Sequence, residues 1–316
     1  MSYSSDVKNN LAEKAFKNRC CMLTELAALI YSCGSIDLAG KGRFGFSFTT
    51  ENEAVMKHII YKLLKRLGIS DDTIVVSVRE FKYRNVFNIC IPASETAVNI
   101  LLECGVLASR DGRIEIQWGD MLIERGFNEC CKRAFLRGVF IGSGSISDIK
   151  KAYHTEIVVR DEAFAAALCG LLASQEVNGK LTLRSNQYVV YIKDSESIEI
   201  FMTLIGAHNV VLDLENIKIL REIKNNTNRA VNCDTANNLR IIRASEKQIK
   251  AIRILTAEKG FSALPEGLRE TAELRINYPD ASLEELCEMH CSSVTKSGVN
   301  HRLRKLCAMA ENLDKN

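Results

Sequence analysis

Long apolar runs are missing from this chain of 316 residues. The longest apolar stretches, such as Leu26 to Tyr31, are far shorter than the roughly 20 residues that a helix needs to cross a bilayer. The amino-terminal segment also lacks the apolar core of a secretory signal, because Asp6 and Lys8 stand there among polar residues. We therefore expect a cytoplasmic protein that has no membrane partner.

The C-x-x-C pair that is typical of many zinc sites is also missing, although the chain has twelve cysteines. Residues 20–21 and 130–131 are adjacent cysteines, so on a helix their side chains diverge by about 100° and neither pair is expected to clamp a metal. Cys287 and Cys291 have i, i+4 spacing, but nothing nearby completes a tetrahedral set. We predict free, mostly buried thiols in a reducing compartment, with no metal and no other cofactor.

The overall balance of residues is that of an ordinary globular protein, with 47% hydrophobic and 26% charged residues. The length favours two domains. The net charge of +3 does not by itself indicate a partner, but the distribution of charged residues along the chain does. Residues 218–253 contain nine Lys or Arg against three acids, and residues 289–310 contain four against none. Positive charge concentrated in the last third of the chain indicates a polyanionic partner.

An internal repeat covers most of the first two thirds of the chain. Residues 18–36 and 128–146 are identical at seven of nineteen positions, at an offset of 110. Further on, residues 94–105 align with residues 195–206 at an offset of 101. Because both the beginning and the end are shared, we interpret the pattern as a duplication.

Both copies predict the element order αββαββα. An apolar helix ends at Gly-Ser-Ile, two strands follow, and a second helix, two more strands and a last helix complete each copy. The predicted strands after the first are 43–49, 73–81 and 85–91 in one copy and 154–159, 180–184 and 187–192 in the other. The second helix begins at Glu51 or Asp161, and the last helix is capped by Ser94 or Ser195 and ends at Gly105 or Gly206.

Small residues recur at a spacing of four in the first helix of each copy. Ala28 and Ser32 align with Gly138 and Gly142. Small residues at this spacing allow two helix backbones to approach closely, so these helices are predicted to pack together along a pseudo-dyad. The alternative is that each helix packs separately into its own core.

These two helices resemble the LAGLIDADG motifs of homing endonucleases, at residues 26–34 and 136–144. The resemblance implies that the residue before each final glycine is an acid that binds a divalent metal in active members. Cys33 and Ser143 stand at those positions. Neither side chain supplies the anionic oxygen that a hard cation such as Mg²⁺ requires, so we predict no catalytic residues and no enzyme activity.

Two nearby acids, Asp37 and Asp148, are the obvious substitutes for the missing metal ligands. Both follow the helix at strand or turn positions, where acids are common for solubility and turn formation. We therefore expect no surviving metal site.

The segment after Ile223 changes in character. Residues 224–238 are rich in asparagine, which predicts turns rather than regular structure. Residues 239–258 return to a helical period with many basic side chains. This stretch either lies on phosphates or is a solvated linker followed by an amphipathic helix packed on its neighbour. Residues 232–237 are too specific for a generic linker, and composition suggests no mechanism for them.

The last segment predicts three short helices. Pro265 opens the first, and residues 278–279 end it. Ser282 and Glu285 form a capping box at the start of the second, which stops near residues 290–293. The third helix is capped by Thr295, runs through Lys305 and faces the core with Val299, Leu303 and Leu306.

A short turn between two helices, the second of them basic and acid-free, is the pattern of a helix-turn-helix. Asn300 is suited to reading adenine and Arg304 guanine, while Lys296, Arg302 and Lys305 are suited to phosphates. Thr295 and Ser297 can place a phosphate on the free backbone amides. The predicted DNA-binding residues are Thr295, Lys296, Ser297, Asn300, His301, Arg302, Arg304 and Lys305. The alternative is a small helical bundle with a solvated basic face.

Nearly the whole chain resembles the WhiA family of Gram-positive bacteria. The residues that carry the resemblance are 232–237, 264–265, 272–275, 279–286 and 296–306. It implies a regulator that joins a degenerate LAGLIDADG domain to a helix-turn-helix and acts in cell division, chromosome segregation and, in sporulating relatives, sporulation.

We therefore expect an α+β fold, in which a duplicated αββαββα unit with pseudo-two-fold symmetry precedes an all-α helix-turn-helix domain. The expected boundaries are 1–223 (repeats about 18–110 and 128–215), 224–260 for the basic linker and helix, and 261–316.

The expected function is sequence-specific binding of double-stranded DNA in transcription regulation, without nuclease activity, by a monomer associated with the nucleoid. One alternative is a maturase-like protein that binds structured RNA. The other is a scaffold whose duplicated domain binds a partner regulatory protein.

Overall fold

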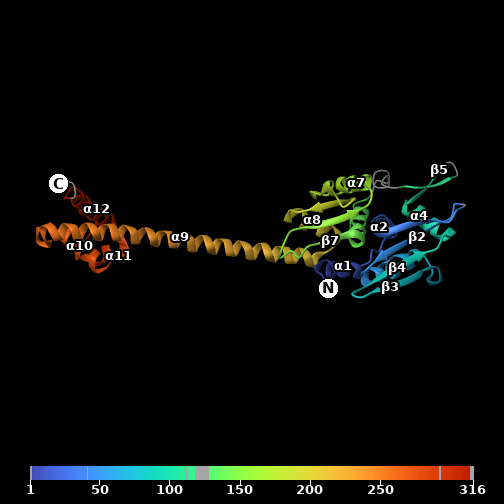
Figure 1. The fold of residues 1–316 in the computed structure, drawn as a ribbon, viewed down its shortest axis with the longest axis horizontal. Helices are drawn as coiled ribbons and strands as arrows, with labels where there is room; N and C mark the ends of the chain where they lie inside the picture. The colour runs from blue at the N-terminus through green and yellow to red at the C-terminus, as the bar shows by residue number, and fades with distance from the viewer. Residues whose placement is uncertain (1, 41, 111–112, 118–127, 292, 314–316) are drawn as a thin grey trace. The chain divides into compact units, whose positions relative to one another are not determined.

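The computed structural model describes residues 2–40, 42–110, 113–117, 128–291 and 293–313. Its chain divides into two compact units, Met1–Ile219 and Leu220–Asn316, here called the amino-terminal and carboxy-terminal units (Figure 1). Among the described residues, none of the helices combines the length and the apolar character that a membrane crossing requires.

The amino-terminal unit contains the predicted element order αββαββα twice, which confirms the duplication. The first copy comprises α2 (Arg19–Cys33), β1 (Gly34–Leu38), β2 (Phe44–Thr50), α3 (Glu53–Lys57), β3 (Val75–Phe81), β4 (Arg84–Ile91) and α4 (Glu95–Cys104). The second comprises α6 (Glu129–Ser143), β7 (Gly144–Ile146), β8 (Thr155–Val159), α7 (Glu162–Ala173), β9 (Lys180–Arg184), β10 (Gln187–Ile192) and α8 (Ser195–Ile205). In the first copy a π-helical turn, His58–Leu64, and the 3-10 turns Lys65–Leu67 and Asp71–Thr73 follow α3.

Each copy builds one four-stranded antiparallel sheet, and the two sheets have the same strand order. The first sheet is ordered β1-β2-β4-β3 and the second β7-β8-β10-β9. Apolar side chains of strands and helices from both copies form one core, with Phe46 and Phe48 on the first sheet and Phe135 and Phe140 on α6. This architecture confirms the predicted α+β class.

Helices α2 and α6 pack against each other in the middle of the unit (Figure 1). A Cβ atom added at Gly138 would lie 2.7 Å from the Cβ atom of Ala28 and 2.7 Å from the backbone oxygen of Glu25. A Cβ atom added at Gly142 would lie 2.0 Å from the Ser32 hydroxyl oxygen. The predicted close approach is confirmed, and the alternative of separate packing is wrong.

Several helix boundaries differ from the predicted ones because another side chain supplies the cap. Ser94 caps α4 as predicted, but Asp194 caps α8 and leaves Ser195 as its first residue. Asn52 caps α3, so this helix begins at Glu53 rather than Glu51. The predicted ends at Gly105 and Gly206 are confirmed, and both glycines are in the left-handed region.

Among the described residues, the elements that were not predicted from the sequence include α1 (Tyr3–Glu13), which buries Val7 and Leu11 in the core, and the paired strands β5 (Leu107–Arg110) and β6 (Arg113–Ile116). Asn52 holds α1 on the first copy, because its amide donates to the side chains of Ser5 and Asn9 at 3.2 and 2.8 Å.

The predicted turns over residues 224–238 are wrong, because one helix, α9 (His208–Lys259), runs through them. The hydroxyls of Thr227 and Thr235 donate to the carbonyls four residues earlier, an arrangement that a helix accommodates at a small cost in stability. Each asparagine costs a helix only a few tenths of a kcal/mol up to about 0.7 kcal/mol, which favourable neighbours can offset.

The carboxy-terminal unit has its own small core. It comprises the last part of α9, the turn Phe261–Ala263, α10 (Glu266–Asn277), α11 (Leu283–Met289) and α12 (Lys296–Leu313). The fully buried side chains include Ile252, Ala272, Leu286, Val299, Leu303 and Leu306. Pro265 is the cap of α10 rather than its first residue, and α12 extends beyond the predicted Lys305.

Candidate nucleic-acid interface

The connection from α10 to α11 is held by side chains at both of its ends. The buried Arg275 guanidinium donates to the carbonyls of Ala281 and Pro279 at 2.7 and 3.3 Å. The Ser282 hydroxyl accepts from the Glu285 amide at 3.2 Å, and the Glu285 carboxylate accepts from the Ser282 amide at 2.7 Å. The predicted capping box is therefore confirmed.

The connection from α11 to α12 is anchored on α10 by a buried histidine. His290 Nε2 lies 3.2 Å from the Thr271 hydroxyl, and Nδ1 lies 3.1 Å from the Glu270 carboxylate. The Cys291 amide donates to the same carboxylate at 2.7 Å, which holds the pKa of Glu270 below its usual value. Ser292, in the turn predicted at 290–293, lies outside the described residues. These contacts fix where α12 begins.

Helix α12 begins and faces the core as predicted. The Thr295 hydroxyl accepts from the Gly298 amide at 3.2 Å, which confirms the predicted cap. Val299, Leu303 and Leu306 are buried. Thr295, Lys296, Ser297, His301, Arg304 and Lys305 are exposed, whereas Asn300 and Arg302 are half-buried.

Apart from the cap Thr295, the local contacts divide the predicted DNA-binding residues into four groups. Arg302 lies over α10, where a Cβ atom at Gly267 would be 3.2 Å from its Cζ. Asn300 and Arg304 line a groove of about 420 Å³ beside the Ala244–Gln248 part of α9. Lys296 pairs with Glu284 at 2.5 Å. The remaining side chains, those of Ser297, His301 and Lys305, are exposed and have none of these neighbours. The most accessible surface of α12 is therefore polar and carries the positive charge of Lys305.

A second candidate site lies at the carboxyl ends of α2 and α6, where the resemblance to LAGLIDADG endonucleases places the metal-binding residues of active members. Cys33 and Ser143 are the last residues of these helices. Burial raises the pKa of the Cys33 thiol to about 11, so the sulfur is protonated at neutral pH. Burial also lowers the pKa of Lys8 to about 8, and Lys8 and Arg160 both interact electrostatically with Cys33. Cationic side chains therefore lie near Cys33, at the place where a metal ion would need anionic ligands.

The two nearby acids occupy the positions that were predicted for them. Asp37 is exposed in β1. Asp148 lies in the turn after β7, where its carboxylate accepts from the Lys150 amide at 3.0 Å. Asp148 therefore has the ordinary role of an acid in a turn.

A buried charged cluster joins α2 to α6, and it was not predicted from the sequence. The Glu25 carboxylate accepts from Arg137 Nε at 2.8 Å and lies 3.2 Å from His58 Nε2. Burial opposes ionisation of Glu25, but the hydrogen bond and charge of His58 and those of Arg137 outweigh it and lower the pKa of Glu25. Arg137 also donates to the Lys14 carbonyl at 2.7 Å. The signal in the sequence that could have indicated this cluster is a charged residue, Glu25 or Arg137, within the predominantly apolar part of each helix.

Comparisons with known proteins agree with this architecture over nearly the whole chain. Three family models match: the WhiA N-terminal LAGLIDADG-like domain at 19–107, the WhiA LAGLIDADG-like domain at 132–224 and the WhiA C-terminal HTH domain at 227–310.

Two relatives carry the name "Probable cell division protein WhiA". One, from Alkaliphilus metalliredigens, is 39% identical and covers 98% of each chain. The other, from Thermoanaerobacter sp., is 43% identical and covers 99% of this chain and 98% of the relative. A crystal structure of full-length DUF199/WhiA from Thermatoga maritima matches with a TM-score of 0.60 and 26% identity, over 99% of both chains. The chain therefore belongs to the WhiA family.

Proposed function

We propose that this protein binds double-stranded DNA sequence-specifically through α12 and regulates transcription of genes for cell division. The observation that carries the proposal is the exposed cationic face of α12, which bears Arg304 and Lys305 and contains no acid up to Ala310. Below this face, the buried apolar stripe and the anchored turn hold the helix rigidly, as a helix in the major groove requires. The proposal gains support from the match to the WhiA HTH domain.

The residues divide between base reading and phosphate contact. Asn300 and Arg304 are adjacent on one edge of α12, and their side chains have the donors and acceptors for adenine and guanine. Lys305 is exposed on the neighbouring edge and suits a phosphate, as do the helix start at Thr295 and Ser297. Lys296 reaches a phosphate only if it leaves Glu284, and Arg302 only if it leaves α10.

A gel-shift series with bound genomic fragments and mixed-sequence duplexes, at two salt concentrations, tests the proposal. For Asn300→Ala with Arg304→Ala, specific affinity should fall at least about tenfold to a hundredfold and approach the non-specific level. For Lys305→Ala, affinity should fall for all sequences, with a salt slope that is smaller by about 1. Lys57→Ala, an exposed lysine on α3, is the matched control and should bind as the unchanged protein does. Unchanged affinity of the double variant would refute the recognition-helix assignment.

The proposal includes that this protein has no nuclease activity. Cys33 and Ser143 supply no hard anionic ligand, and Lys8 adds positive charge beside Cys33. Incubation of the full chain with a plasmid library and Mg²⁺ should leave the DNA uncut. Reproducible cleavage at a defined sequence would contradict this part of the proposal.

The cellular role is proposed from the relatives. Their name indicates cell division, and we extend the role to chromosome segregation and, in sporulating hosts, to sporulation. A cytoplasmic monomer associated with the nucleoid fits this role, because the internal duplication already supplies a pseudo-dyad within one chain. Sedimentation at micromolar concentration and mapping of bound chromosomal fragments check the monomer and the association.

A second function, binding of a partner regulatory protein by the amino-terminal unit, has one specific observation in its favour. Val76 and Val78 share one face of β3 and are exposed, as are Leu181 and Leu183 on one face of β9. Apolar groups at corresponding strands of both sheets are typical of a protein-binding surface. A chain that ends at residue 223 and still restores function in cells would favour this scaffold role. Competition between duplex DNA and structured RNA separates both functions from that of a maturase-like protein.

A further inference from the structure

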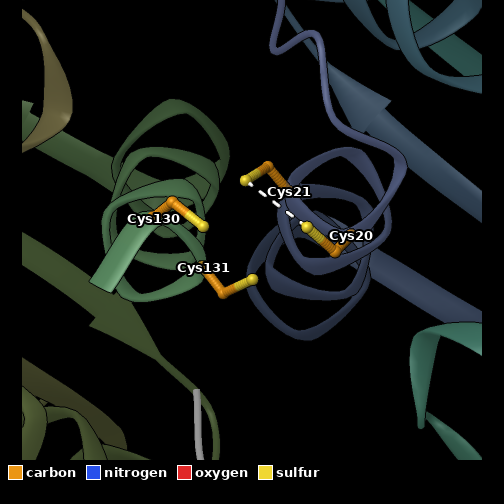
Figure 2. Close-up of side chains that lie close together, drawn as sticks. All are labelled: Cys20, Cys21, Cys130 and Cys131. Atoms are coloured by element: carbon orange, nitrogen blue, oxygen red, sulfur yellow. Dashed lines mark hydrogen bonds between the residues drawn. The ribbon is translucent and has the colours of Figure 1, made fainter. Parts of the chain in front are cut away.

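Four cysteine side chains converge between the first turns of α2 and α6. Cys20 and Cys21 point from one helix toward Cys130 and Cys131 on the other (Figure 2). All four sulfur atoms lie within 4.8 Å of one another, and those of Cys20 and Cys21 are 3.9 Å apart. Neither adjacent pair was expected to clamp a metal by itself, and the structure adds that the opposite helix places a second pair beside the first.

The spacing of the sulfurs fits one thiophilic ion. A tetrahedral Zn²⁺ with bonds of about 2.3 Å places its sulfur ligands about 3.8 Å apart. The longest separation in the cluster needs to shrink by only about 1 Å, which small side-chain rotations provide. Cys21 and Cys131 are buried, whereas Cys20 and Cys130 are exposed and leave a path for the ion to enter.

We propose that Cys20, Cys21, Cys130 and Cys131 bind one Zn²⁺ ion in a structural site that joins the two copies of the duplication. Because four protein sulfurs fill a tetrahedral shell, no position stays open for a substrate. The site is also remote from the helix ends that carry Cys33 and Ser143, since Cys33 follows Cys20 by thirteen positions, which is about 20 Å along a helix.

The surroundings of the cluster suit a metal with four thiolates, which carries a net charge of about −2. The amino-terminal ends of both helices meet there, and within the described part of the chain neither Asn18 nor Asn128 makes a side-chain capping hydrogen bond. The positive amino-terminal ends of the two helices stabilise thiolates. Phe16 packs on Cys21 and Cys131 and shields one side.

The protonation of the thiols predicts how the affinity depends on pH. Cysteine binds a metal ion as the thiolate, so metal binding has to release the protons of the four thiols. The affinity must therefore increase with pH.

The test uses the full-length chain, stripped with a chelator under reducing conditions and titrated with Co²⁺ and then Zn²⁺. We expect one equivalent of Co²⁺, with the visible bands of a tetrahedral thiolate site, displaced by one equivalent of Zn²⁺. Excess Zn²⁺ at about 100 times Kd should raise Tm by roughly 5–10 °C.

Paired variants locate the site. Cys20→Ser with Cys130→Ser removes the two exposed ligands, spares the buried core and should weaken binding by about two orders of magnitude or more. Cys233→Ser with Cys291→Ser removes two exposed thiols elsewhere and should bind as before.

Three results would overturn the proposal. They are a reduced chain that takes up no Co²⁺ at any pH up to 8, a Co²⁺ spectrum that is unchanged in the Cys20 and Cys130 variant, and a disulfide between the two helices in protein isolated from a reducing cytosol. The last result would identify a redox pair in place of a metal site. Circular dichroism of the variant establishes that a lost spectrum does not reflect a lost fold.

Discussion

The contact between α2 and α6 in one unit and helix α12 in the other use their charged groups in opposite ways. In the amino-terminal unit, Glu25, His58 and Arg137 are buried between helices that lie more than 100 residues apart in the sequence. In the carboxy-terminal unit, the cations of α12 remain at the surface above an apolar stripe. A duplicated scaffold without metal-binding acids thus uses charge to join its halves, while the helical unit offers charge to a partner.

The largest expected effect comes from breaking the buried cluster. Arg137→Met leaves the Glu25 carboxylate buried with His58 as its remaining partner, and we expect the free energy of unfolding to fall by about 3–5 kcal/mol. Calorimetry and denaturant unfolding measure the change.

A double variant distinguishes charge pairing from packing. Arg137→Met combined with Glu25→Leu removes both charges and should recover much of the lost stability. If the double variant is less stable than Arg137→Met alone, the cluster stabilises the unit mainly by the shape of its side chains. The contrast drawn above between the charged groups of the two units would then be refuted.

The close approach of α2 and α6 should show the next largest effect. Gly138→Ala places a Cβ atom against Ala28 and the Glu25 backbone, and we expect a loss of about 1–3 kcal/mol. Gly170→Ala, on α7, is the matched control: no atom lies within 4 Å of its Cβ position, so the change should stabilise the helix by roughly 0.5–1 kcal/mol. Similar values for the two variants would show that the helices separate easily.

The smallest effect concerns a local device of the carboxy-terminal unit. Ser282→Ala breaks the capping box of α11 and should cost about 1 kcal/mol. Hydrogen exchange of amides in α11 measures the loss directly. Ser262→Ala, at an exposed position before α10, should leave that exchange unchanged. Faster exchange throughout the amino-terminal unit would contradict the independence of the two cores.

The predictions that succeeded rest on local patterns. The strands at 180–184 and 187–192 were predicted to the residue, because alternating side chains and a two-residue turn are read from consecutive positions. The cap at Thr295 and the capping box at Ser282 succeeded for the same reason. The turns expected at 224–238 failed, because asparagine is only a weak determinant and α9 continues on both sides.

The amino-acid sequence by itself determined the duplication, the αββαββα order and the basic character of α12, since each follows from periodicity and spacing along the chain. Only the tertiary structure decided which side chains meet across the pseudo-dyad. Cys20 and Cys130 are 110 positions apart, as their equivalence in the repeat shows, and no local pattern states that they face each other. Packing of two helices at their small residues sets that distance, and it also brings Glu25 to Arg137.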